Sequence, residues 1–184
     1  KKTLIKRLGY VIISVFAAIL LSLPFGLGNV ISQYFGTLDS YNYMSVNAYN
    51  LWTALGLNWK PLNPFASLLG TVFIILTVIA SGVIFFRIKG RERYFLSAGF
   101  ICLSVFMLSV KMHERYLYPA VALFLFGAFM IKEKRAFTSY LLVTLALTLN
   151  CGIVLFNAGG SAVAAMGGMI AMAVFAYVIY ALFN

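Results

Sequence analysis

Six long apolar runs divide this chain of 184 residues, and each is close to the length needed to cross a lipid bilayer. A spanning helix needs about 20 mostly apolar residues, because the hydrocarbon core is about 30 Å thick and each residue rises about 1.5 Å. We predict spanning helices at residues 8–27, 64–86, 94–110, 116–131, 136–157 and 160–183. The sequence therefore predicts an all-α fold, a polytopic transmembrane helix bundle that forms a single domain over residues 1–184.

The composition agrees with exposure to lipid. Hydrophobic residues make up 63% of the chain and charged residues 10%, whereas ordinary globular chains carry about 45–50% apolar and about 25% charged residues. The excess apolar surface needs lipid beside it, so the bilayer is the first partner that we expect. The two cysteines, Cys102 and Cys151, lie inside apolar runs and predict neither a disulfide framework nor a zinc site. We expect no metal and no cofactor.

The net charge of +10 comes from basic residues in short clusters between the apolar runs. This arrangement is typical of membrane orientation and not of a nucleic-acid-binding surface, so we expect no nucleic acid partner. Eleven of the 14 basic residues lie before the first run, between the second and third, or between the fourth and fifth. Cytoplasmic loops carry an excess of Lys and Arg. These loops and both termini are therefore predicted to be cytoplasmic, with Lys60, Lys111 and Arg115 outside.

The one long connection, residues 28–63, is extracytoplasmic in this topology and rich in aromatic and polar residues. An apolar stripe at helical spacing runs through Tyr41, Met44, Ala48, Leu51, Trp52 and Leu55. Asp39 or Ser40 is suited to cap such a helix, and Gly56 to end it. We therefore predict an interfacial helix over residues 40–56 on the outer surface, with Asn63 and Pro64 starting the next spanning helix.

The last apolar run carries Gly160, Ala164 and Gly168 at four-residue spacing. Small residues on one face let another helix approach closely. We favour packing within the molecule over a dimer seam. None of the six runs holds an acidic or basic residue at mid-depth, which argues against ion-coupled transport.

The outer loop between the third and fourth runs concentrates titratable residues, namely Lys111, His113, Glu114 and Arg115. Charged groups at a membrane boundary are costly unless they are solvated, paired or used. One interpretation is a solvated loop whose basic and aromatic side chains form an interfacial belt. A metal site is disfavoured, because Leu117 stands where the zinc-protease pattern needs a second histidine. The third interpretation is an anion site, in which Arg115, Lys111 and His113 donate to a lipid phosphate and Glu114 orients one of them.

The run His113-Glu114-Arg115-Tyr116-Leu117-Tyr118-Pro119 resembles the His-Glu-Arg-Tyr-type segment of bacterial polytopic glycosyltransferases of the GT-C class. These enzymes are related to the protein O-mannosyltransferases that use polyprenyl-phosphate sugars. The upstream stretch from Ser45 to Trp52, continued by residues 56–59, is also similar to such proteins. The two stretches together span about 80 residues of this sequence.

The resemblance implies the C-terminal membrane region of such an enzyme, in a bacterial plasma membrane. The reaction would move a sugar from a polyprenyl phosphate to an acceptor outside the cytoplasm. His113, Glu114, Arg115 and Lys111 would bind the lipid phosphate of the donor. The residues expected to line the neighbouring groove, roofed by residues 40–60, are Asn47, Asn50, Trp52 and Tyr116.

The family's acidic catalytic residues lie in the first outer loop of a longer protein, and Asp39 does not stand in a matching motif. No catalytic residue is therefore assigned, and whether the chain is itself an enzyme stays open. An N-terminal half or a partner subunit would supply the carboxylate. The alternative is a non-catalytic membrane subunit or scaffold that binds a lipid carrier or a partner protein.

Overall fold

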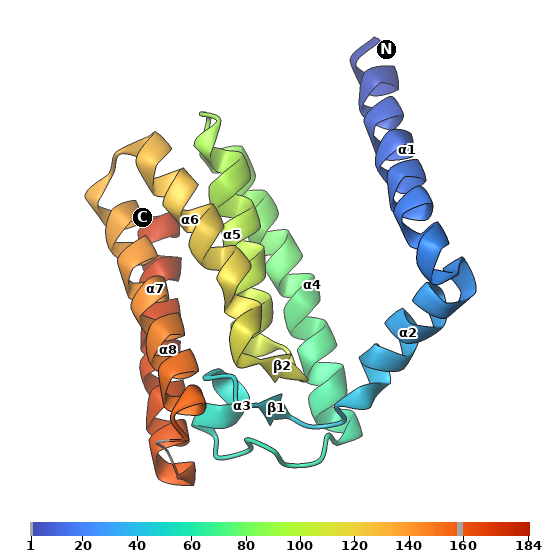
Figure 1. Cartoon of the computed structure of the whole chain (residues 1–184). Coiled ribbons are helices and arrows are strands. Elements are labelled where there is room, and N and C mark those ends of the chain that lie inside the picture. Colours follow the sequence, from blue (N-terminus) through green and yellow to red (C-terminus); the bar gives the residue numbers. More distant parts are fainter. Residues whose placement is uncertain (1, 158–159) are drawn as a thin grey trace. The chain divides into compact units, whose positions relative to one another are not determined.

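A computed structural model describes residues 2–157 and 160–184 and shows an all-α protein (Figure 1). Five helical stretches are long and apolar enough to cross a membrane: Leu8–Phe25, Pro64–Arg87, Glu114–Ile131, Lys134–Leu155 and Ser161–Phe183. The chain divides into two compact units, residues 1–41 and 42–184, which are described separately below. The single domain over residues 1–184 stays a prediction.

The first unit contains α1 (Lys2–Ser22), the 3₁₀ turn η1 (Leu23–Phe25) and α2 (Leu27–Ser40). The predicted helix over 8–27 stops earlier than expected, because Pro24 and Gly26 interrupt it. Proline lacks a backbone donor, and Gly26 has a φ of 77°, in the left-handed region that glycine tolerates best. The helix that follows is amphipathic. Leu27, Ile31 and Phe35 recur at four-residue spacing on one face, and Asn29, Gln33 and Thr37 on another.

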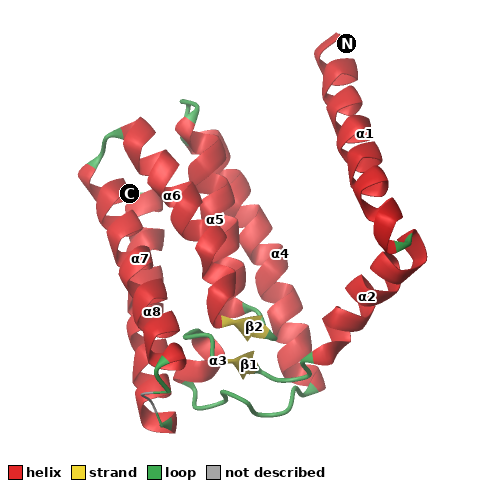
Figure 2. Cartoon of the chain, viewed as in Figure 1, coloured by secondary structure: helices red, strands yellow, loops and turns green. Residues whose placement is uncertain are grey.

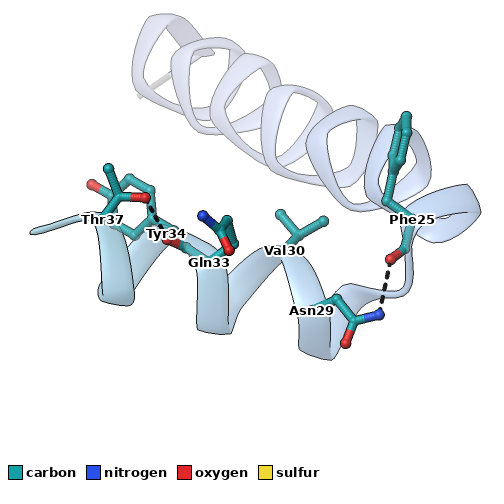
Figure 3. Close-up of a pocket in the computed structure, with 6 residues that line it drawn as sticks. All are labelled: Phe25, Asn29, Val30, Gln33, Tyr34 and Thr37. Atoms are coloured by element: carbon teal, nitrogen blue, oxygen red, sulfur yellow. Dashed lines mark hydrogen bonds between the residues drawn. The ribbon is translucent and has the colours of Figure 1, made fainter. Parts of the chain in front are cut away.

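The polar face of α2 borders an open hollow beside η1 (Figure 3). Its lining residues are Phe25, Asn29, Val30, Gln33, Tyr34 and Thr37. Two of the polar groups bond locally: Asn29 Nδ2 donates to Phe25 O at 3.3 Å, and Thr37 Oγ1 donates to Gln33 O at 2.7 Å. Thr37 thus bonds within its own helix, while Asn29 ties the start of α2 back to η1.

The predicted interfacial helix over residues 40–56 is wrong. Ser40 ends α2, and the only helix in the remainder is the single turn α3 (Leu51–Ala54). Between them lies β1 (Ser45–Val46), and Asn47 has a φ of 59°, which no right-handed helix allows. The side chain of Asp39, considered as a cap, lies outside the described residues. Gly56, with a φ of 74°, follows the short helix as a turn residue.

Half of the apolar stripe of this segment is buried by tertiary contacts and not by a helical face, whereas Tyr41 and Leu55 are exposed. Met44, Ala48 and Trp52 are all buried, and Met44 and Trp52 form a small core with Ala66 of the next helix. Residues from an extended stretch and from a single helical turn are thus buried by neighbouring parts of the bundle. The four-residue spacing of Met44, Ala48 and Trp52 matches a helical period, although these residues do not lie on one helix.

The second unit is a bundle of five long helices (Figures 1 and 2). In chain order they are α4 (Pro64–Arg87), α5 (Glu92–Leu108), α6 (Tyr118–Ile131), α7 (Lys134–Leu155) and α8 (Ser161–Phe183). Helix α4 starts as predicted, because the side chain of Asn63 accepts a hydrogen bond from Ala66 N at 2.8 Å and Pro64 follows it. The short strand β2 (Met112–His113) and the 3₁₀ turn η2 (Glu114–Leu117) connect α5 to α6.

Helix α5 is the interior element of this bundle, since it contacts α4, α6 and α8. Leu103, Phe106 and Met107 of α5 pack with Phe124 of α6 and Val143 of α7, and all five are buried. Large apolar side chains on the outer faces of the other helices are exposed, among them Leu76, Phe86, Phe129, Leu145 and Ile170. Lipid is the environment that stabilises such faces.

The turns after α4 and α6 and the last turn of α8 lie at one end of the bundle (Figure 1). The guanidinium of Arg87 donates to Phe183 O at 2.8 Å across this end. The strands, η2 and α3 lie at the opposite end. Within residues 42–184, the two basic loops therefore share one end of the bundle, and the loop that contains His113 lies at the other end.

The small-residue face of α8 packs within the molecule. A Cβ on Gly168 would lie 2.5 Å from Ala54 N and 3.0 Å from Asn50 O. Helix α8 therefore contacts the backbone of α3 directly, as the preference for intramolecular packing predicts. This contact packs α3, and with it the segment 42–62, against the bundle.

Candidate functional site

The two stretches that carry the sequence resemblance meet in space. Strand β1 pairs in parallel with β2, with Ser45 opposite Met112 and Val46 opposite His113. Asn47 forms a further bridge with His113. Figure 2 shows this pair as the only drawn strands, at the end of the bundle that carries α3. Long-range pairing is what fixes the titratable loop against the aromatic segment.

We call the paired residues 45–47 and 112–113 the junction. His113 lies at its centre and is only 5% exposed. Its ring meets the ring of Tyr116 edge to face, with the centroids 5.2 Å apart. Burial lowers the pKa of His113, the charge of Arg115 lowers it further, and Glu114 opposes the shift. The imidazole is therefore neutral at neutral pH, so it can donate a hydrogen bond but adds no positive charge.

Arg115 offers the exposed charge of the site. Its side chain is 58% exposed, and Nη1 lies 3.4 Å from Glu114 Oε1, whose side chain is 18% exposed. The guanidinium also lies 5.8 Å from the ring centre of Tyr116. One long ion pair leaves several of the five guanidinium donors available. Lys111 begins the same turn with a φ of 61°, and its N–H donates to Met44 O at 3.2 Å.

Asn50 and Trp52 attach the segment to the bundle through hydrogen bonds. Asn50 is fully buried; its Oδ1 accepts from Thr53 N at 3.2 Å, and its Nδ2 donates to Phe106 O at 3.2 Å. Trp52 Nε1 donates to Leu108 O at 3.1 Å. The last carbonyls of α5 have no partner inside their own helix. These two side chains satisfy them and hold α3 in place, whereas a groove-lining role for them stays a prediction.

Asn47 borders a cavity of about 390 Å³ next to the junction. The cavity is lined by Asn47, Thr53, Gly56, Asn58, Trp59, Lys60, Asn157, Gly160, Ser161 and Ala164. Asn47 Oδ1 accepts from Trp59 Nε1 at 2.7 Å and from Asn58 Nδ2 at 3.3 Å, so the indole is fixed. Amides, hydroxyls, one ammonium group and a half-exposed indole make this a polar cavity of ligand size. None of His113, Glu114, Arg115 or Tyr116 lines it.

Sequence reasoning missed Asn150, which connects α7 to the junction. This residue is 1% exposed; its Oδ1 accepts from Tyr49 N at 3.0 Å, and its Nδ2 donates to Asn47 O at 2.7 Å. An amide inside an apolar run is costly unless it is bonded. That cost is the sequence signal that could have marked it.

A buried hydroxyl cluster completes the junction. Thr53 Oγ1 lies 2.6 Å from Ala48 O and 3.0 Å from Ser45 Oγ. Thr53 and Ser45 are both fully buried. Over residues 2–157 and 160–184, no three His, Cys, Asp or Glu side chains gather as metal ligands would. This end therefore offers an exposed guanidinium at Arg115 and hydrogen-bonding groups in the polar cavity.

Comparison of the chain with protein-family models, with curated proteins and with solved structures finds no match to any of them.

Proposed function

We propose that this chain is the C-terminal membrane region of a glycosyltransferase that uses a polyprenyl-phosphate-linked sugar, of the mannosyltransferase type. In this proposal, α1, α4, α5, α6, α7 and α8 all cross a bacterial plasma membrane. The basic loops and both termini face the cytoplasm, because positive charge is retained there. The end that carries β1 and β2 then faces outward.

Support for a sixth span comes from the packing of α5. At 17 residues it is short for a span, since about 20 are usual. It nevertheless lies alongside α4 and α6 over its length and joins turns at opposite ends of the bundle. If α5 crosses the membrane beside its neighbours, its backbone N–H and C=O groups inside the membrane are hydrogen-bonded within the helix, as a spanning segment requires.

The single observation that carries the functional proposal is the pairing of Val46 with His113. It joins the two stretches that resemble the glycosyltransferases, which are far apart in the sequence, into one structure at one end of the bundle. Beside it lie an exposed guanidinium suited to a phosphate and a polar cavity of ligand size. A phosphate-linked sugar needs a cation that binds its phosphate and a polar cavity that binds its hydroxyl groups.

One observation favours the alternative of a non-catalytic subunit that binds the carrier. Within residues 42–184, Glu114 is the only carboxylate at the outward end, and it pairs with Arg115. Sugar transfer needs a general base to activate the acceptor hydroxyl. In the enzyme proposal, that base comes from an N-terminal half or from a partner subunit.

Ligand binding by the purified chain in lipid nanodiscs tests the proposal. The ligands are a polyprenyl phosphate mannose and the polyprenol of equal length without phosphate. We expect the phosphate-bearing lipid to bind at least about tenfold more tightly, because charge-assisted hydrogen bonds hold it. Equal affinity for both lipids would contradict carrier recognition.

Incubation of the same sample with a simple mannoside acceptor separates the two candidates. Mannose transfer supports an enzyme whose base lies in this chain. Binding without transfer supports the carrier-binding subunit, and restoration of transfer by an added N-terminal half supports the divided enzyme.

A further inference from the structure

The basic end of residues 42–184 carries a second candidate site. A hollow of about 810 Å³ lies where α5 begins and α6 ends. Three cations share its lining with apolar and aromatic groups: Lys89, Gly90, Arg91, Arg93, Tyr94, Phe95 and Met130. No residue of this hollow belongs to the site at the β1–β2 end.

The electrostatic balance of this end is positive. Seven basic residues lie in its turns and helix ends, namely Arg87, Lys89, Arg91, Arg93, Lys132, Lys134 and Arg135, against Glu92 and Glu133. Among the described residues, no ion pair joins either carboxylate to these cations. The carboxylate of Glu92 lies against Gly90, at the edge of the hollow. One carboxylate therefore lies beside a hollow whose lining holds three cations.

The guanidinium of Arg93 packs against two aromatic rings but has few hydrogen-bond acceptors. Its guanidinium carbon lies 4.5 Å from the ring centre of Phe85 and 5.2 Å from that of Tyr94. Its Nη2 reaches the hydroxyl of Tyr94 only at 3.5 Å, and within the described part of the chain its buried Nε has no acceptor. A buried donor without a partner costs free energy. The terminal nitrogens of this guanidinium, with one long hydrogen bond, are the donors that Arg93 offers to acceptor oxygens in the hollow.

Apolar surface continues from the hollow along α6. Met130, Phe129 and Phe126 are 42%, 64% and 57% exposed. The ring of Phe95 packs against Phe126 with the centroids 5.7 Å apart. A free anion would leave this surface unused, whereas a molecule with an anionic head and an apolar tail matches both parts.

The geometry points to a binding site for the headgroup of an anionic phospholipid. The phosphodiester lies against Lys89, Arg91 and Arg93, and an acyl chain follows Phe126 and Met130. Basic pockets between spanning helices bind anionic headgroups in this manner. The site does not depend on the proposed glycosyltransferase function.

Thermal unfolding of the purified chain in neutral detergent tests this site, with phosphatidylglycerol, phosphatidylcholine or inorganic phosphate added. We expect phosphatidylglycerol alone to raise the unfolding midpoint in a saturable manner. Arg93→Gln should weaken the apparent affinity about tenfold, because charge-assisted hydrogen bonds are lost. Equal effects of the two lipids, or an equal effect of inorganic phosphate, would overturn the proposal.

Two further variants make the test specific. Arg93 also packs on Phe85, so the double variant Lys89→Gln/Arg91→Gln removes two exposed charges of the hollow without disturbing that contact. It should weaken phosphatidylglycerol binding as Arg93→Gln does. Lys134→Gln removes one charge from the same end outside the hollow. If Lys134→Gln weakens binding as strongly as the hollow variants, diffuse charge explains the effect and the site is refuted.

Discussion

Asn150 and Tyr49 are joined by a hydrogen bond from the Tyr49 N–H to the Asn150 side-chain oxygen, at 3.0 Å. The same amide donates to Asn47 O at 2.7 Å. One side chain of α7 thus satisfies two backbone groups of the β1–α3 connection. This bond pair is the main polar link between α7 and the junction.

Asn150→Ala should destabilise the protein by about 2 kcal/mol or more, because a buried backbone donor and a buried acceptor lose their partners. Unfolding in mixed micelles measures the free energy. Thr148→Ala is the matched control on the same helix, since Thr148 is exposed and its hydroxyl donates to Thr144 O. The control should change the free energy of unfolding by less than about 0.5 kcal/mol. Equal effects of the two variants would show that the Asn150 bonds contribute little.

The close approach of α8 to α3 gives a second prediction. Gly168→Ala places a Cβ 2.5 Å from Ala54 N, so the backbone must shift, at a cost of about 1–3 kcal/mol. Gly152→Ala on α7 meets no atom within 4 Å. That control should leave stability unchanged or raise it by about 0.5–1 kcal/mol through helix propensity. Tolerance of alanine at Gly168 would mean that α3 does not dock there.

His113 should make stability depend on pH. Its pKa in the folded state is lowered below 6.5, mainly by burial, so the unfolded chain binds the proton more readily. The stability that the neutral imidazole contributes is therefore fully present above the pKa of His113 in the unfolded chain, and it is lost as the pH falls below that value. We expect the unfolding midpoint to decrease between about pH 7 and pH 5, above the range where carboxylates titrate.

His113→Gln is the decisive variant for that pH dependence, because His113 is the only histidine in the sequence. The substitution should lower the midpoint at every pH through lost packing, but flatten its slope in this range. A slope that persists in His113→Gln would assign the pH dependence to another group.

Much of the bundle could be predicted from the sequence. Apolar runs of spanning length, and the Asn63–Pro64 helix start, are local signals that packing does not change. The break at Pro24 and Gly26 was also a local signal, and the apolar pattern on either side of it concealed the break.

The junction could be predicted only in part. The loop containing His113 and Arg115 was identified from its density of titratable groups, but its pairing with Val46 depends on contacts between distant residues. The stripe through Met44, Ala48 and Trp52 favoured a helix because burial by several elements produced the same spacing. Asn47, with its positive φ, shows why a helix cannot form there.

The proposed orientation gives a prediction based on a matched pair of lysines. Lys60 and Lys89 are both exposed, and they lie beyond opposite ends of α4, since Lys60 precedes this helix and Lys89 follows it. In a background of Cys102→Ser and Cys151→Ser, Lys60→Cys should react with an impermeant maleimide in intact bacteria. Lys89→Cys should react only after the membrane is permeabilised. The reverse pattern would place the basic loops outside and remove the basis for an outward site.

The most direct measurement of the central claim is the affinity of Arg115→Gln for a polyprenyl phosphate mannose, in nanodiscs of constant lipid composition. Arg115 is exposed, so the fold should be unaffected, with the unfolding free energy within about 0.5 kcal/mol of the wild type. Lys132→Gln, at the opposite end of the bundle, is the control. The account predicts an affinity at least about tenfold lower for Arg115→Gln and an unchanged value for the control. An unchanged affinity in Arg115→Gln would contradict carrier-phosphate binding at this site.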